Sequence, residues 1–213
     1  MAGMDSMIRL ILILILIFLT GCGNLPIAYI QNFSSVNNVI FGFPEYEITK
    51  EIYDSYESSF MKIRFGKGPH AILILAYINN DIYEWVGSDD VRIYTYQGRI
   101  IQTTGLPHNF EIKKFRDDVI PNTMSSMELV NLYNPDLYSA TINQLFKIKS
   151  SKIKKLENEL AVNKIYEDFN IASIGWSGTN LYYQNKDTLR IEAVEQEIHP
   201  RLPRAKVEYY VKY

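Results

Sequence analysis

Residues 91–104, VRIYTYQGRIIQTT, decide the predicted fold. Apolar side chains alternate with polar or aromatic ones over 91–96, the period of two that is typical of a half-buried strand. Gln97-Gly98 follows as a tight turn, because glycine adopts a positive φ without steric cost. The chain then returns over Arg99 to Thr103, so the stretch predicts an antiparallel hairpin.

The neighbouring segments extend this pattern into a meander of short strands. Met61 to Phe65 alternates, and Ala71 to Ile78 (AILILAYI) is an apolar run that predicts a strand covered on both faces. Tyr138 to Ser150 and Lys152 to Ile165 predict two long strands joined near Ser150-Ser151. The other predicted strands cover 82–87, 171–176, 181–184, 188–198 and 205–211.

Two segments predict short helices. Glu45 to Tyr56 has Thr49 as its predicted cap, and Ser125 to Leu132 has a capping-box spacing between Ser125 and Glu128. The predicted fold class is therefore all-β: an antiparallel β-sandwich or open barrel with one or two short helices, behind an N-terminal signal peptide.

The composition excludes several classes of function and structure. The 213 residues contain 22 basic and 24 acidic side chains and carry a net charge of -2, which argues against nucleic acid as a partner. The single cysteine excludes an internal disulfide framework and a cysteine-based zinc cluster. Tyrosine is abundant, with 16 residues, which favours strands.

The N-terminus indicates export. Leu10 to Leu19 is an uninterrupted apolar run behind Arg9, too short to span a bilayer but typical of a secretory signal. Leu19-Thr20-Gly21-Cys22 resembles the lipobox of bacterial lipoproteins. That resemblance implies cleavage between Gly21 and Cys22 and acylation of Cys22, with palmitate-like chains holding the protein in the membrane.

The predicted domains follow from this cleavage site. Residues 1–21 are the signal peptide, 22–44 the lipidated cysteine and its tether, and 45–213 a single β-rich domain. Met7, just before Ile8 and Arg9, offers an alternative translation start. Gly23 after the cysteine favours the outer membrane by resemblance to lipoprotein sorting rules.

The meander carries residues of a known family. Leu75-Ala76-Tyr77, Glu84-Trp85-Val86, Gly98-Arg99-Ile100 and Thr103-Thr104-Gly105-Leu106, in this order behind a lipobox, resemble the YjbF/GfcB lipoproteins of Gram-negative exopolysaccharide and group 4 capsule loci. Asn180-Leu181-Tyr182, Gln196 and Pro200 resemble the closing segment of that family. Leu189 and Val194 depart from it, standing where a turn glycine and a serine are expected.

The resemblance implies a lipid-anchored, periplasm-facing accessory protein of the outer membrane that assists exopolysaccharide or capsule production or export. Its implied partner is an outer-membrane β-barrel protein of the same locus. It implies no cofactor and no catalytic residues. The motif residues have structural or interaction roles: Trp85, Gly98, Arg99, Thr103, Gly105, Leu106, Asn180 and Gln196.

The alternative function is a periplasmic glycan-binding module. Tyr94 and Tyr96 could present rings to sugars, and Lys147 and Lys149, in a lysine-rich hairpin, could meet acidic groups of an exopolysaccharide. Cross-strand packing and a solvated strand surface are the competing interpretations of these two pairs.

The sequence gives little support for catalytic or metal-binding residues. His70, His108 and His199 lack a metal-ligand spacing and are interpreted as surface residues. Asp89-Asp90 and Asp117-Asp118 are interpreted as turn residues rather than a glycosidase pair, and Ser177 in Gly175-Trp176-Ser177-Gly178 as loop chemistry rather than a nucleophile. The sequence therefore predicts neither a catalytic nor a metal site.

Overall fold

The computed structural model describes residues 42–88, 90–114 and 125–212. Within these ranges no helix has both the length and the apolar character needed to cross a bilayer. The elements are α3 (Lys50–Ser55), the 3₁₀ helix η1 (Ala172–Ile174), and the strands β1 (Phe60–Phe65), β2 (His70–Asn79), β3 (Ile82–Val86), β4 (Arg92–Tyr96), β5 (Arg99–Thr104), β6 (Phe110–Lys114), β7 (Ser125–Leu132), β8 (Leu137–Lys155), β9 (Asn158–Ile171), β10 (Trp176–Asn185), β11 (Ile191–Gln196) and β12 (Ala205–Tyr210).

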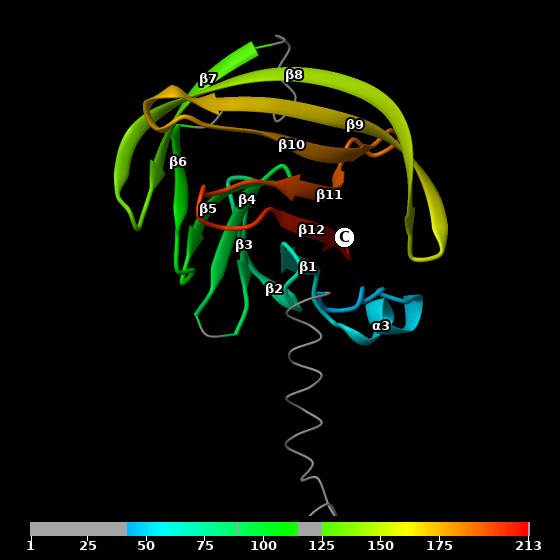
Figure 1. Cartoon of the computed structure of the whole chain (residues 1–213). Coiled ribbons are helices and arrows are strands. Elements are labelled where there is room, and N and C mark those ends of the chain that lie inside the picture. Colours follow the sequence, from blue (N-terminus) through cyan, green and yellow to red (C-terminus); the bar gives the residue numbers. More distant parts are fainter. Residues whose placement is uncertain (1–41, 89, 115–124, 213) are drawn as a thin grey trace, which may run out of the picture. The chain divides into compact units, whose positions relative to one another are not determined.

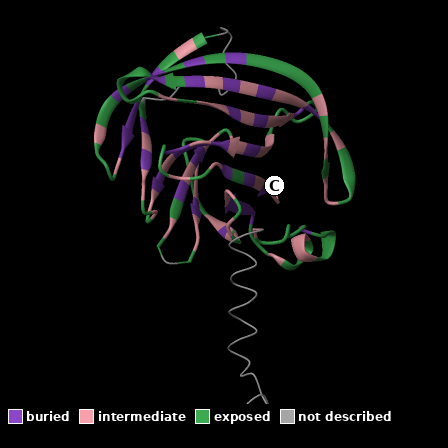
Figure 2. Ribbon diagram, in the orientation of Figure 1, coloured by how far each residue is buried: buried purple, intermediate pink, exposed green. Residues whose placement is uncertain are grey.

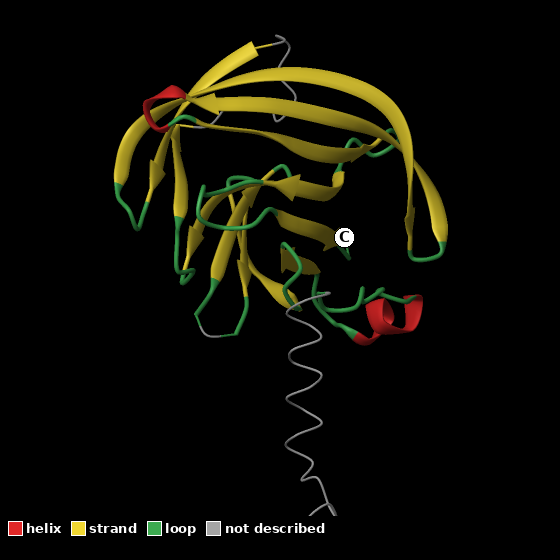
Figure 3. Ribbon diagram, viewed as in Figure 1, coloured by secondary structure: helices red, strands yellow, loops and turns green. Residues whose placement is uncertain are grey.

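The twelve described strands form one antiparallel sheet that closes on itself (Figures 1 and 3). Each strand pairs with its neighbours in the sequence, and β12 pairs with β1 from Phe60↔Tyr210 to Phe65↔Ala205. The predicted all-β class is confirmed, and the sheet is a closed barrel. Closure removes the free edges that an open sheet would have to protect.

The hairpin predicted for residues 91–104 forms between β4 and β5. Gln97 and Gly98 both have positive φ, 48° and 78°, between β4 and β5. A side chain at Gly98 would also collide with the barrel, because an added Cβ would lie 2.5 Å from the Cβ of Ile191. Glycine is therefore required here for two independent reasons.

The first predicted helix is confirmed as α3. The hydroxyl of Thr49 accepts a hydrogen bond from the backbone N–H of Ile52 at 3.3 Å. Side chains of this segment pack on the outer face of β1 and β12, where the ring of Phe60 stacks on Tyr210 with centroids 4.9 Å apart. A small second core thus covers the outside of the barrel at this point.

The second predicted helix is wrong: Ser125–Leu132 is strand β7. Burial alternates at its start, with Met127 and Leu129 exposed and Glu128 buried between them. The strand pairs with β8 from Ser125↔Leu145 onward. The capping-box spacing was misleading because Glu128 points into the barrel, where tertiary contacts override helix propensity.

The predicted junction of the two long strands is also wrong. Ser150 and Ser151 lie within β8, and the turn lies at Leu156 and Glu157, both with positive φ. Neither residue is common in turns, so the sequence does not indicate where this turn lies. Residues 171–176, predicted as a strand, contain η1 and the break between β9 and β10.

Only the first part of strand β2 is covered on both faces. Leu73 belongs to the main core and Ile72 packs against the outer cluster with Ile48. Towards its end, Tyr77 and Ile78 are 67% and 49% exposed, contrary to the prediction for the apolar run. Figure 2 shows how buried residues alternate with exposed ones along the strands, as a filled barrel requires.

Candidate functional site

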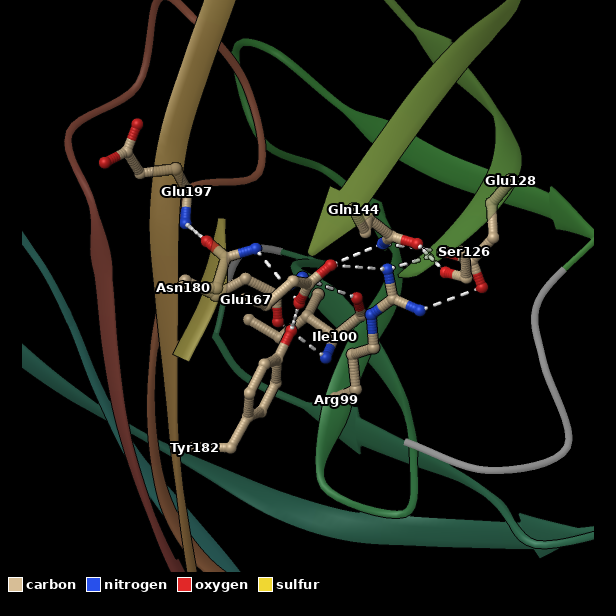
Figure 4. Close-up of polar contacts among 10 residues, drawn as sticks. Arg99, Ile100, Ser126, Glu128, Gln144, Glu167, Asn180, Tyr182 and Glu197 are labelled. Carbon is tan, nitrogen blue, oxygen red and sulfur yellow. Dashed lines mark hydrogen bonds and ion pairs between the residues drawn. The ribbon is translucent and has the colours of Figure 1, made fainter. Parts of the chain in front are cut away.

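Arg99, the first residue of β5, lies inside the barrel with a side chain only 4% exposed. Its guanidinium donates to both carboxylate oxygens of Glu128 on β7, at 3.0 and 2.7 Å (Figure 4). It also contacts Glu167 on β9 at 3.3 Å. Two-point contact is the strong geometry for an arginine–carboxylate pair. These partners lie 29 and 68 residues from Arg99 along the chain.

Amide and hydroxyl groups complete this interior polar cluster. Gln144 Nε2 on β8 donates to Glu128 at 3.0 Å and also to Glu167. From β10, Asn180 Nδ2 donates to Glu167 at 3.4 Å, and the hydroxyl of Tyr182 donates to the same carboxylate. Five strands are therefore joined by side chains in the barrel interior.

The electrostatics keep Arg99 charged. Burial by itself lowers the pKa of its guanidinium, but the negative charges of Glu167 and Glu128 outweigh burial, and the pKa is raised. Two carboxylates thus share one buried cation. The three charges depend on one another, because removal of Arg99 would leave Glu128 and Glu167 buried without a cation.

The paired carboxylates raise the question of glycosidic cleavage, which uses two carboxyl groups on either side of a sugar. The side chains of Glu128 and Glu167 are 1% and 0% exposed, and Arg99 lies between them. A sugar has no path to carboxylates that are enclosed by their own strands. The cluster therefore has the character of a structural network that holds strands together.

Gln196 makes a second link across the barrel. Its side-chain amide on β11 accepts from the N–H of Ile100 at 3.0 Å and donates to the carbonyl of Ile100 at 2.9 Å. Strands β5 and β11 are not neighbours in the sheet, and β5 pairs with β6 only through Gln102↔Glu111. The amide thus satisfies backbone groups of β5 where ladder bonds to β6 end.

Trp85 is a core residue. It is 1% exposed, and its indole N–H donates to the hydroxyl of Thr95 at 2.8 Å. Its ring lies 5.6 Å from that of Tyr209, whose hydroxyl donates to the carbonyl of Gly98 at 2.8 Å. The motif residues Trp85 and Gly98 are therefore connected through Tyr209.

Thr103, Gly105 and Leu106 form the corner after β5. The Thr103 hydroxyl accepts from the N–H of Phe110 at 3.1 Å, and Asn109 Oδ1 accepts from the N–H of Leu106 at 3.1 Å. Gly105 has φ 78°, and an added Cβ would lie 2.7 Å from the carbonyl oxygen of Asp90. This motif fixes the turn between β5 and β6.

The structure brings Arg99 and Asn180 into one cluster, yet the sequence did not reveal Glu128, Gln144 or Glu167. One signal was available: Glu167 occupies an apolar phase between Ile165 and Phe169. A carboxylate in the inward position of a strand predicts a buried partner.

The predicted glycan contacts lie apart. Tyr94 and Tyr96 are half-buried on β4, whereas Lys147 and Lys149 are exposed on β8. Lys147 pairs with Asp168 at 2.8 Å, and Lys149 lies 5.4 Å from the ring of Tyr166. Because β8 is continuous, Lys152 and Lys154 point to the opposite face from Lys147 and Lys149. The predicted lysine-rich hairpin is therefore not one basic patch.

The histidine interpretation is wrong for His199, which is 1% exposed and stacks on His108 with centroids 4.9 Å apart. Burial, with the charges of His108 and Arg201, lowers the pKa of His199 to about 4. His70 is half-buried and lies 3.4 Å from Glu45. Among the described residues, no group of three or more metal-ligating side chains converges.

The remaining polar candidates do not form a site. Ser177 lies within strand β10 rather than in a loop, and its side chain is exposed. Asp90 is an exposed turn residue with φ 58°. Asp89, Asp117 and Asp118 lie outside the described residues, as do Gly21 and Cys22.

The fold and the filled interior define a class of protein: a small all-β barrel domain held by a buried ionic network. The crystal structure of the hypothetical lipoprotein YmcC from Escherichia coli (K12) has this fold. It superposes with a TM-score of 0.66 and 14% identity, over 83% of this chain and 95% of that one.

Residues 33–209 match the family described as "Group 4 capsule polysaccharide lipoprotein gfcB, YjbF", and the chain belongs to this family. A curated relative, the uncharacterized lipoprotein GfcB of Escherichia coli (strain K12), is 23% identical over 117 residues. That alignment spans 54% of this chain and about half of the relative, 53% of its length. The resemblance inferred from the sequence motifs is confirmed.

Proposed function

We propose that this protein is anchored by acylated Cys22 in the outer membrane and faces the periplasm. There it assists capsule or exopolysaccharide production or export by contact with an outer-membrane β-barrel protein of the same locus. The observation that carries the proposal is the family match over residues 33–209, downstream of a lipobox-like Leu19-Thr20-Gly21-Cys22.

We further propose that this role is not enzymatic. The converging carboxylates of Glu128 and Glu167 are enclosed by the barrel and held by Arg99. The family members named above are described as lipoproteins, without an activity.

The outer face of β7 and β8 supports such a contact. Met127, Leu129 and Leu145 are 69%, 39% and 56% exposed. The register Ser125↔Leu145 and Met127↔Asn143 places all three on one face, with Leu145 diagonal to Met127 and Leu129 two residues further along β7. Exposed apolar side chains that gather in one place are typical of interaction sites. Because every described strand has a neighbour on both sides, the face of the sheet, rather than an edge, is the surface available.

Site-specific photocrosslinking in intact cells tests this proposal. A photoreactive residue at Met127 is expected to capture an outer-membrane protein of the capsule locus, identified by mass spectrometry. The same residue at Lys67, which is exposed on the β1–β2 turn, is the control. Equal capture from both positions, or unchanged capsule export after deletion of the gene, would contradict the proposal.

A further inference from the structure

Several turns at one end of the barrel surround a cleft. In an up-and-down barrel alternate turns lie at the same end, and here the β2–β3, β4–β5 and β10–β11 turns contribute Asp81, Gln97 and Thr188 to Arg190. Together they enclose a pocket of about 380 Å³. Small-molecule sites occur preferentially in such barrel mouths, with volumes of about 300–1,000 Å³.

Aromatic rings form the floor of this mouth cleft. Trp85, Tyr83 and Tyr209 line it, with ring centroids 6.1 Å apart for Tyr83 and Trp85 and 5.6 Å apart for Trp85 and Tyr209. The Trp85 and Tyr209 rings are fixed by their bonds to Thr95 and to the carbonyl of Gly98. Trp85 and Tyr209 are only 1% and 4% exposed, so the half-buried ring of Tyr83 is the aromatic surface that a ligand meets. The ordered rings beneath it preorganise the floor, which lowers the entropy lost on binding.

The rim of the mouth cleft is polar and balanced in charge. Asp81 supplies a carboxylate, Arg190 a guanidinium, Gln97 an amide and Thr188 a hydroxyl. Such a set donates to and accepts from hydroxyl groups, whereas a single acid and a single base do not select a strongly charged ligand.

A second pocket borders the mouth cleft. It has a volume of about 250 Å³ and shares Arg190, Ile191, Tyr209 and Val211 with the first pocket. Lys155, Leu156 and Asn158 line it at the β8–β9 turn, so side chains of this turn lie next to the mouth cleft.

We propose that the mouth cleft binds a short segment of a glycan. The partly exposed ring of Tyr83 packs against the C–H face of a sugar, while the rim pairs with sugar hydroxyls. This inference rests on the proposed function only for the source of the glycan, which is the capsule polysaccharide. It replaces the lysine-rich hairpin as the glycan surface, because the lysines of β8 point to opposite faces.

Tryptophan fluorescence reports on this cleft directly. The second tryptophan, Trp176, packs edge-on against Phe169 and does not line the cleft. The Trp176→Phe chain therefore leaves Trp85 as the only fluorophore of its kind. Titration with short oligosaccharides released from the capsule by mild acid is expected to change Trp85 emission saturably, and calorimetry on the same samples should give the same Kd.

Matched variants separate the cleft from the rest of the surface. Asp81→Asn and Arg190→Gln are each expected to weaken binding about tenfold, since each removes a charged hydrogen-bond partner. Asp187→Asn, in the same β10–β11 turn but outside the cleft, and Arg201→Gln should bind as the parent chain does. Circular dichroism establishes that every variant is folded.

The outcomes distinguish this inference from the proposed function. No saturable signal from Trp85 and no heat of binding would overturn the mouth cleft as a glycan site. Equal weakening by Asp81→Asn and Asp187→Asn would overturn it as well. Neither outcome affects crosslinking at Met127, which lies on β7 and is not part of the cleft.

Discussion

Single side chains supply much of the long-range connectivity of this barrel. Arg99 on β5 binds Glu128 on β7 and Glu167 on β9, and Gln196 on β11 bonds to the backbone of Ile100. Each contact joins strands that are not neighbours in the sheet. The family motifs Gly-Arg and Gln196 thus have a physical reason: they tie opposite parts of the barrel together.

Replacing Arg99 by methionine is expected to destabilise the protein by about 3–5 kcal/mol, because two buried carboxylates lose their cation. Urea unfolding measures the change. Arg92→Gln, which breaks a partly exposed pair with Glu84, is the control and should cost about 1 kcal/mol or less. Similar losses for the two variants would mean that Glu128 and Glu167 do not depend on Arg99.

Leu189 occupies a position suited to glycine. It has φ 59° and is 65% exposed, so its left-handed conformation carries strain without a compensating burial. Leu189→Gly is expected to raise the free energy of unfolding by about 0.5–1 kcal/mol, net of the entropy that glycine adds to the unfolded chain. Leu189→Ala keeps the strain and should bring no gain in a thermal melt.

His199 makes stability depend on pH. Its folded pKa is about 4, whereas the ordinary value is 6.5, so the unfolded chain binds the proton first as the pH falls. The contribution of neutral His199 to the free energy of unfolding is therefore present above pH 6.5 and is lost toward pH 4. The loss is about 2 kcal/mol between pH 7 and 5.

His199→Asn keeps an acceptor for the N–H of Arg201, which His199 Nδ1 now provides at 3.1 Å. This variant should remove most of the loss in denaturant titrations at the two pH values. His70→Asn is the comparison: burial also lowers the pKa of His70, so this variant removes that contribution but should keep the loss of stability due to His199. An unchanged pH profile in the His199→Asn variant would show that other groups cause the acid sensitivity.

At the scale of elements, local chemistry predicts some strands well and others poorly. The β4–β5 hairpin follows from alternation and Gln97-Gly98, and α3 from its Thr49 cap. Strand β7 was missed because Glu128 fits a capping box equally well. The β8–β9 turn was misplaced because Leu156 and Glu157 adopt positive φ without a turn-forming side chain. These errors arise where tertiary contacts outweigh local preference.

The β4–β5 turn is expected to be far less tolerant than the turn after η1. Gly98→Ala should cost about 2–4 kcal/mol, because positive φ and the clash with Ile191 act together. Gly175 also has positive φ, 61°, but an added Cβ meets nothing within 4 Å. Gly175→Ala should therefore cost only about 1 kcal/mol. Equal costs in urea unfolding would refute the packing argument.

At the scale of the whole molecule, the sequence predicts the all-β class but not the closure of the sheet. Closure depends on the pairing of Phe60–Phe65 with Ala205–Tyr210, and no local pattern reports contacts so distant along the chain. The cluster around Glu167 has the same origin, since its residues come from five strands. The mouth cleft likewise forms only when separate turns meet at one end of the barrel.

The proposed anchor makes a prediction for the whole molecule. Cys22→Ser should abolish acylation of the protein, because serine cannot carry the thioether that attaches acyl chains worth about 0.8 kcal/mol per buried CH₂. Metabolic labelling with a palmitate analogue measures this. Gly21→Ala, which keeps a small residue before the cysteine, is the control and should remain labelled; labelling of the serine variant, or none of the parent, would contradict lipidation of Cys22.

Because the second edge of β1 pairs with β12, the barrel cannot close until Ala205–Tyr210 is available. A nascent polypeptide that lacks Ala205–Tyr210 keeps an open seam with unpaired backbone groups on β1 and β11. Such late closure delays folding and exposes edges that invite aggregation.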